Sequence, residues 1–212
     1  MRALAIMFMA VLLVGVFAVG PGSALATPTD WTVNGKPLAP GEEVAVKFAS
    51  SSPIELIVPA LKFRIICKSW TAKGKLDGGE IGTGRLVIPK LSGCVEPEEK
   101  AKVHFRFRKG RFGVTTDKKH EKGAQDTTEL EVPKGQATLV VEPDFTKGRK
   151  EEFEMAGIID AFGPGPEREN LLEFPKPELL TTTLEVGGQR AELVGKAAFN
   201  LPGHAKLSQG EL

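Results

Sequence analysis

The sequence predicts an all-β protein, an antiparallel β-sandwich that follows a removable leader. Turn-forming residues recur about every 8–12 positions, and the segments between them alternate apolar with polar side chains. No amphipathic run is long enough for a substantial α-helix. The pattern fits one large sandwich or two small immunoglobulin-like sandwiches, and both architectures stay open at this point.

The first 26 residues have the pattern of a secretory signal peptide. A positive start at Arg2 precedes an unbroken apolar run over residues 3–19, and Ala24 and Ala26 supply the small residues that a signal peptidase recognises. The alternative is an uncleaved anchor, but a membrane span needs roughly 20 apolar residues and this run is shorter. We therefore expect a protein that begins at Thr27, has no transmembrane segment after cleavage, and is secreted or associated with the cell envelope.

The composition is that of an ordinary globular protein. Of the 212 residues, 41% are hydrophobic and 26% are charged. The formal net charge of +1 argues against a nucleic-acid partner, which would need a strongly basic surface. The chain has no tyrosine and only two tryptophans, Trp31 and Trp70, which weakens the case for a lectin because sugars usually stack on such rings.

A predicted N-terminal β unit spans residues 27–97. Trp31 begins a short strand that leads into an Asn34-Gly35 turn, a pair favoured in tight hairpins. Residues 54–58 and 61–67 are more uniformly apolar, as strands buried on both faces are, and Pro59 separates them. The unit is completed by a strand over residues 43–48, a glycine-rich loop over residues 77–84 and a return to strand at residues 85–88.

The two cysteines, Cys67 and Cys94, predict a disulfide in this unit. An even number of cysteines in an exported chain usually forms bridges, and this one would stabilise the fold by roughly 3–4 kcal/mol. The alternative is a pair of buried free thiols. Their spacing excludes a CxxC redox motif, and two cysteines with scattered histidines do not make a zinc site.

A predicted C-terminal β unit spans residues 98–212, after a charged boundary over residues 96–100. Three hairpins are expected here because each keeps its apolar residues on one face, which a shift by one residue would break. The expected turns are Lys109-Gly110 with Phe107 opposite Phe112, residues 133–136 with Val132 opposite Ala137, and residues 187–190 with Val186 opposite Ala191.

The remaining segments of this unit are less regular. Residues 157–162 are expected to form a strand and residues 163–166 a loop. Residues 167–174 fit either a short helix or another strand. The last residues, 206–212, are expected to fray, as chain termini commonly do.

A basic face on the first predicted hairpin is the most pointed candidate site. The candidate anion-binding residues are His104, Arg106, Arg108 and Arg111. One hypothesis is that they bind an anionic polymer of the cell envelope or a membrane surface. The alternative is that the basic residues pair with glutamates of the same protein, at Glu129 and Glu131 or at residues 151–154, which the low net charge favours.

No residue pattern predicts catalysis, a metal site or a cofactor. The three histidines, His104, His120 and His204, lie far apart in the sequence and show no metal-ligand spacing. Carboxylates that pairing in space might bring together are Asp77, Glu80, Asp117, Asp144 and Asp160. No nucleophile elbow, phosphate loop or metalloprotease motif is present.

The N-terminal third resembles uncharacterised secreted β-rich proteins of high-GC Gram-positive bacteria. The resemblance rests on residues 31–35, Leu38 and Gly41, on the Ile66-Cys67 pair and on Gly93-Cys94. It implies export, β structure and the Cys67–Cys94 bridge, and no activity. Members of this group often carry further cysteines towards the C-terminus, and this chain does not.

The sequence therefore predicts a secreted or envelope-associated protein that is a non-catalytic structural or binding module. Its expected partners are an anionic envelope polymer or another extracellular protein. Two alternatives remain: a polyanion binder that uses the basic hairpin over residues 100–122, and a secreted hydrolase with paired carboxylates, which requires a cleft lined by acids with raised pKa values.

Overall fold

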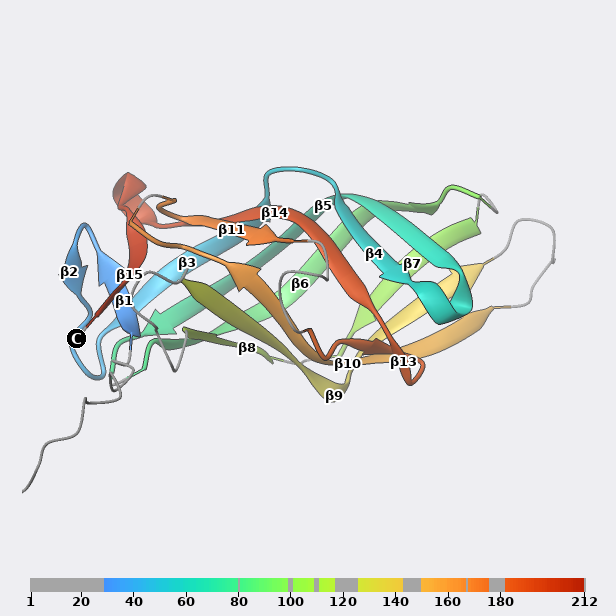
Figure 1. Ribbon diagram of the computed structural model, residues 1–212, viewed down its shortest axis with the longest axis horizontal. Coiled ribbons are helices and arrows are strands. Elements are labelled where there is room, and N and C mark those ends of the chain that lie inside the picture. Colours follow the sequence, from blue (N-terminus) through green and yellow to red (C-terminus); the bar gives the residue numbers. More distant parts are fainter. Residues whose placement is uncertain are drawn as a thin grey trace, which may run out of the picture.

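The computed structural model describes residues 29–79, 81–98, 101–108, 111–116, 126–142, 150–166, 168–175 and 182–211 (Figure 1). The all-β class is confirmed, since these ranges hold strands and two single-turn 3-10 helices, η1 (Pro59–Leu61) and η2 (Pro202–His204), and no α-helix. No helix of the described ranges is long and apolar enough to cross a membrane. The predicted leader and its cleavage site lie outside these ranges.

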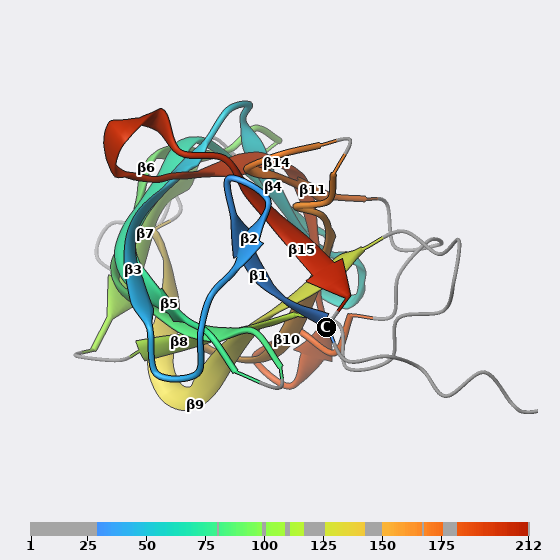
Figure 2. The same cartoon turned by 90° about the vertical axis from the view of Figure 1, so that its left-hand side faces the viewer.

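The large sheet is antiparallel and closes on itself. Its strands are β3 (Glu43–Ser50), β4 (Ile54–Val58), β5 (Phe63–Asp77), β6 (Thr83–Glu96), β7 (Ala101–Phe107), β8 (Arg111–Thr116), β9 (Thr127–Glu142), β10 (Glu151–Phe162), β11 (Leu171–Phe174), β12 (Glu185–Val186), β13 (Gln189–Arg190) and β14 (Glu192–Asn200). Pairing runs through β3, β5, β6, β8, β9, β10, β11 and β14 and returns to β3. Figure 2 shows the resulting ring end on. Opposite walls face each other across one core, as the layers of a sandwich do.

The two predicted units share this one sheet. β7 of the second predicted unit pairs antiparallel with β6 of the first, with Val95 opposite Lys102. β14 pairs with β3 and β4, so the end of the chain lies beside its beginning. A single cluster of buried apolar side chains draws on strands from both units. The question of one sandwich or two is thereby answered by one continuous sheet around one core.

A small three-stranded sheet covers one end of the ring (Figure 2). It consists of β1 (Thr29–Val33), β2 (Lys36–Pro37) and β15 (Leu207–Glu211). Asn34 and Gly35 form the expected turn, both with the positive φ angles, 52° and 74°, that a two-residue hairpin requires. The expected fraying of the C-terminus is wrong, because β15 pairs along the whole of β1 and Leu207 is fully buried.

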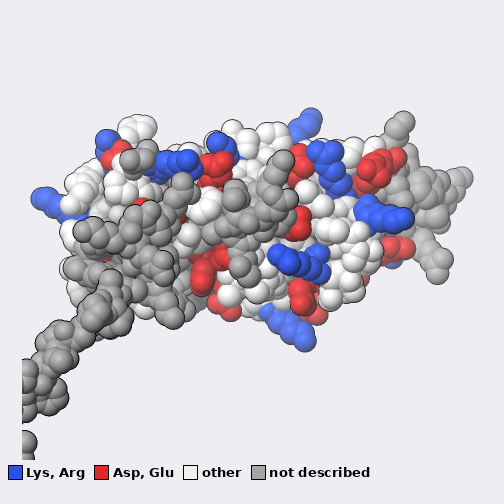
Figure 3. All heavy atoms as spheres, viewed as in Figure 1, with Lys and Arg blue, Asp and Glu red and all other residues white. Residues whose placement is uncertain are grey.

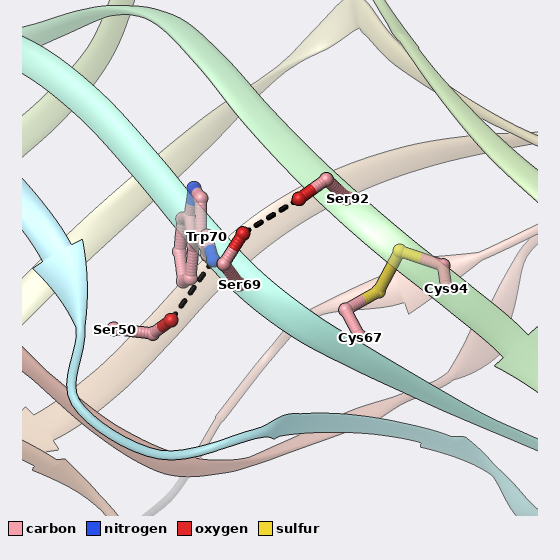
Figure 4. Close-up of a disulfide and its surroundings, with 6 residues drawn as sticks. All are labelled: Ser50, Cys67, Ser69, Trp70, Ser92 and Cys94. Carbon is pink, nitrogen blue, oxygen red and sulfur yellow. Dashed lines mark hydrogen bonds between the residues drawn. A yellow bond between two sulfur atoms is a disulfide. The ribbon is translucent and has the colours of Figure 1, made fainter.

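The expected order of the N-terminal strands is confirmed. The segments at residues 43–48 and 54–58 fall in β3 and β4. The segment expected over residues 61–67 becomes strand two residues later, at Phe63 in β5, because η1 occupies Pro59–Leu61. The glycine-rich segment connects β5 to β6. Cys67 and Cys94 occupy opposed positions on these two strands and form the predicted disulfide, with an S–S distance of 2.11 Å (Figure 4).

The first two expected hairpins are wrong. β7 does not pair with β8, because the two follow one another along the sheet, each between β6 and β9. Residues 133–136 do not end a strand either; they are extra residues within β9, whose partner β10 passes from Met155, opposite Ala137, to Gly157, opposite Val132. In both places the residues whose side chains face the core change from odd-numbered to even-numbered positions, or from even-numbered to odd-numbered ones. An interruption or a bulge produces that change within a strand as a hairpin turn does between strands.

The third hairpin is present with a shorter turn than expected. Gly187 and Gly188 form a two-residue turn, both with positive φ, and Val186 therefore pairs with Gln189 rather than Ala191. The strand expected over residues 157–162 is the second half of β10. The segment over residues 167–174, which fitted helix or strand, ends in the strand β11.

Candidate functional site

An apolar cavity lies inside the ring, where several strands change which of their residues face inward. On β5 the buried positions pass from Cys67 to Trp70, and on β9 they pass from Val132 to Ala137. Between β7 and β8 they pass from Phe107 to Phe112. Each change needs extra residues or a local twist, and the side chains on either side of it do not fill the interior evenly.

The cavity measures about 30 Å³ as the volume open to the centre of a water molecule. That is room for about two waters, since one needs roughly 10–15 Å³ on this measure. Its surface is entirely apolar, the kind of surface that does not retain water. It is lined by Leu56, Trp70, Leu91, Phe105, Phe107, Phe112, Val132, Ala137, Met155, Ile159, Leu184 and Leu193.

Three phenylalanines form one wall of the cavity. The rings of Phe105 and Phe107 have centroids 6.3 Å apart and are nearly parallel, and Phe107 meets Phe112 edge to face at 5.7 Å. Met155 lies on β10, which β9 separates from the strands of these phenylalanines. Flat rings and an unbranched thioether shape an interior that can adapt to a guest, because methionine fills irregular spaces through several rotatable bonds.

Trp70 contributes the one polar group among the lining side chains. It is 6% exposed and packs against Phe48, 4.7 Å between centroids, and Phe174, 5.9 Å. Its backbone N–H donates to the Ser50 hydroxyl at 2.9 Å, while its indole nitrogen lies at the end of the ring away from Ser50 (Figure 4). That Nε1–H has no hydrogen-bond partner in the described part of the chain. The other tryptophan, Trp31, donates its Nε1–H to the Thr83 carbonyl at 2.8 Å.

The wall of the ring is unpaired beside this cavity. β6 pairs with β8 up to Val87 and with β7 from Val95 onwards. Within the described residues, no ladder pair joins residues 88–94 of β6 to residues 103–108. The side chains of Leu91, Phe105 and Phe107 border this stretch and are only partly buried. An approach to the cavity from this side would pass between these three lining side chains.

The basic face is partly paired within the protein. Arg106 forms an ion pair with Glu152 at 2.9 Å, one of the glutamates that the self-pairing interpretation named. Exposed His104 faces solvent on β7 and helps Lys150 to hold the pKa of Glu142 below its usual range, chiefly through the hydrogen bond from Lys150. Arg108 is exposed at the end of β7, and the side chain of Arg111 lies outside the described residues.

The expected opposition of Arg108 and Arg111 does not occur, because β7 and β8 are not a hairpin. Basic and acidic side chains are interspersed over the face drawn in Figure 3. Anion binding by His104, Arg106, Arg108 and Arg111 stays a prediction. Lys100, Lys109 and residues 117–125, which hold the rest of the basic segment and His120, lie outside the described ranges.

The carboxylates do not line the cavity. Asp160 lies opposite Glu129 on neighbouring strands, at positions that alternate with the inward-facing ones. Burial, with the repulsion of Glu129 as a smaller cause, raises the pKa of Asp160 to about 6. Burial and Glu43 raise the pKa of Asp77. Glu80, Asp117 and Asp144 lie outside the described residues. Among the described ones, no group of three or more potential ligands is placed to hold a metal ion.

Sequence reasoning missed the cavity. Several of its lining residues stand on either side of a change in the inward-facing positions, and that change was visible in the sequence between Phe107 and Phe112 and between Val132 and Ala137. It was interpreted as two turns. The chain matches no protein-family model, no curated protein and no solved structure. The interpretation of the site therefore rests on its own residues.

Proposed function

We propose that this protein is an exported, non-catalytic binding module that holds a small apolar molecule inside its closed sheet. The observation that carries the proposal is the interior cavity, whose surface is wholly apolar and which lies beside an unpaired stretch of the wall. Ligand sites in proteins are concave and mostly apolar, and the interior of a closed sheet is a common place for them.

The small volume sets how a guest is accommodated. At about 30 Å³ the cavity holds only the thinnest molecule without rearrangement, so a larger one enters by displacing side chains. Leu91, Phe105 and Phe107 border the unpaired stretch and have room to move outward. Met155 is the most adaptable of the buried lining residues.

Export is part of the same proposal. The signal-peptide pattern of residues 1–26 and the disulfide between Cys67 and Cys94 both favour an oxidising compartment, either outside the cell or at its envelope. An anionic polymer as ligand receives less support, because Arg106 already pairs with Glu152. A hydrolase with paired carboxylates receives less support as well, because no acid of the described ranges lines this cavity.

The test is the binding of an apolar fluorescent probe, 1-aminoanthracene, to the mature protein. We expect saturable binding with enhanced emission, and loss of both in Ala137→Leu, where the added carbons occupy the cavity. Ala137 is 1% exposed and lines the cavity, so the substitution fills space without adding a polar group.

The matched control is Ala45→Leu, the same change at an exposed position of β3. It should bind the probe as the unmodified protein does. Circular dichroism and thermal melting of both variants show whether each is folded. Absence of probe binding to the unmodified protein, or equal binding by a folded Ala137→Leu variant, would contradict the proposal.

A further inference from the structure

The unpartnered indole N–H of Trp70 identifies the kind of molecule that the cavity takes. A buried donor without an acceptor is rare in folded proteins, and each instance calls for a reason. The contrast with Trp31 is informative, because the fold gives that equally buried indole a carbonyl acceptor at 2.8 Å. The donor of Trp70 has none among the residues that the structure describes, and its ring lines the cavity.

We propose that the ligand is a neutral, unbranched alkyl-chain compound with one hydrogen-bond acceptor, a carbonyl or hydroxyl oxygen, which accepts from the indole N–H of Trp70. This inference rests on the proposed function, because it specifies what the same cavity binds. The acceptor would satisfy the indole N–H that lies behind the apolar surface of the cavity, and the chain would occupy the cavity itself.

The ligand is neutral because the lining offers nothing to balance a charge. All twelve lining side chains are uncharged, and Trp70 alone carries a donor. An ionised carboxylate or amine would lose its water and find no counterion, which is strongly unfavourable. A single neutral acceptor is the polar content that this cavity can satisfy.

The ligand is slender because the cavity is small and because a guest would reach it along the unpaired stretch of the wall. The unpaired stretch runs along β6 and β7 beside Leu91, so an extended chain can lie partly in the cavity and partly between these strands. The Nε1 atom does not form part of the cavity surface in this arrangement. The guest therefore reaches it by displacing an apolar neighbour, a movement that the small volume already requires.

Nuclear magnetic resonance gives the direct test. The chain has two tryptophans, so a ¹⁵N-labelled sample shows two indole N–H signals. Titration with 2-heptanone should move the Trp70 signal downfield, as a new hydrogen bond does, and leave the Trp31 signal in place. Titration with n-octane, which has the same number of heavy atoms and no acceptor, should give no downfield shift. The spectrum of Trp31→Phe assigns the two signals.

Competition against 1-aminoanthracene gives the energetic test. The ratio of the 2-heptanone Kd to the octane Kd should rise about 5–10-fold in Trp70→Phe, which is the loss of one neutral hydrogen bond. It should not change in Trp31→Phe. Octanoate at pH 8 should not compete.

The outcomes separate this inference from the proposed function. Suppose that both compounds displace the probe, but the ratio of their Kd values changes less than 2-fold in Trp70→Phe or the Trp70 signal responds alike to both. The inference about the acceptor is then overturned, and the proposed apolar site stands. If neither compound nor the probe binds, both fail. Should Trp70→Phe not fold, the two titrations of the unmodified protein still decide the matter.

Discussion

Removing the Cys67–Cys94 bridge should lower the melting temperature by about 7–14 °C. The bridge closes a loop with a sequence separation of 27 residues. In the chain-entropy treatment a loop of that length contributes about 3.5 kcal/mol at 25 °C through the unfolded state. For a domain of this size each kcal/mol corresponds to roughly 2–4 °C. The measurement is thermal melting of Cys67→Ala/Cys94→Ala and of the unmodified protein with and without reductant.

The control for this prediction lies two residues away on the same pair of strands. Ser69 and Ser92 link β5 to β6 through a hydroxyl hydrogen bond of 2.6 Å (Figure 4). Replacing both by alanine removes a cross-strand link without leaving an unpaired partner, so the change should stay below about 1 kcal/mol. Equal melting temperatures of the oxidised and reduced proteins, or a larger loss in the serine variant than in the cysteine variant, would refute the reasoning.

Three further predictions concern other parts of the fold. Because burial raises the pKa of Asp160 to about 6, its ionisation removes stability as pH rises from 4 to 6. Asp160→Asn should therefore unfold in urea with a free energy about 1 kcal/mol higher than that of the unmodified protein at pH 7–8, a value discounted for the half-exposed site. Below pH 4 the two proteins should be equally stable, and a gain independent of pH would contradict this. Gln209→Ala should lower the free energy of unfolding by about 1–3 kcal/mol in the same assay, because the Gln209 amide donates to the Thr127 carbonyl at 2.8 Å. An unchanged urea midpoint would show that β15 adds little to the stability of the protein. Leu91→Arg should abolish uptake of the apolar probe while Val95→Arg, at an exposed site on the same strand, should not; equal uptake would exclude a lateral approach.

The sequence predicted those elements whose cause is local. The Asn34-Gly35 turn follows from two residues that tolerate positive φ. The Gly187-Gly188 turn has the same origin, although the expected turn was longer, over residues 187–190. The all-β class follows from alternation and from the lack of a helical period. The disulfide follows from there being only two cysteines in a chain whose first residues have the pattern of an export signal. None of these predictions needs knowledge of which strands are neighbours.

The C-terminal residues show where that local reasoning stops. Residues 206–212 have little apolar content, so their sequence alone indicates a frayed end. In the fold, residues 207–211 form β15 beside β1, and Leu207 and Gln209 become buried there. The partner strand comes from the opposite end of the chain, more than 170 residues away. Order in such a segment depends on a pairing that no short window of sequence contains.

The two misassigned hairpins are the more instructive difference, because they occur at the cavity. A change from odd to even inward-facing positions has two physical causes: the chain reverses, or it continues with extra residues. Both keep every apolar side chain on the core side, so hydrophobic pattern cannot separate them. Both between β7 and β8 and at residues 133–136 the strand direction is kept, and the two irregularities are adjacent, since the Arg108 N–H donates to the Gln136 carbonyl at 2.8 Å.

That adjacency links the irregular strands to the proposed function. A strand that bulges shifts its partners, and β7 consequently meets β6 only from Val95 onwards, which leaves the wall beside Leu91 unpaired. The same shifts leave Phe107, Phe112, Val132 and Ala137 around a space that none of them fills. A regular sheet with these residues would be fully paired and solid. The cavity and the approach to it therefore have one cause, so a variant that shortens the 133–136 bulge should close both together and lose probe binding while gaining stability.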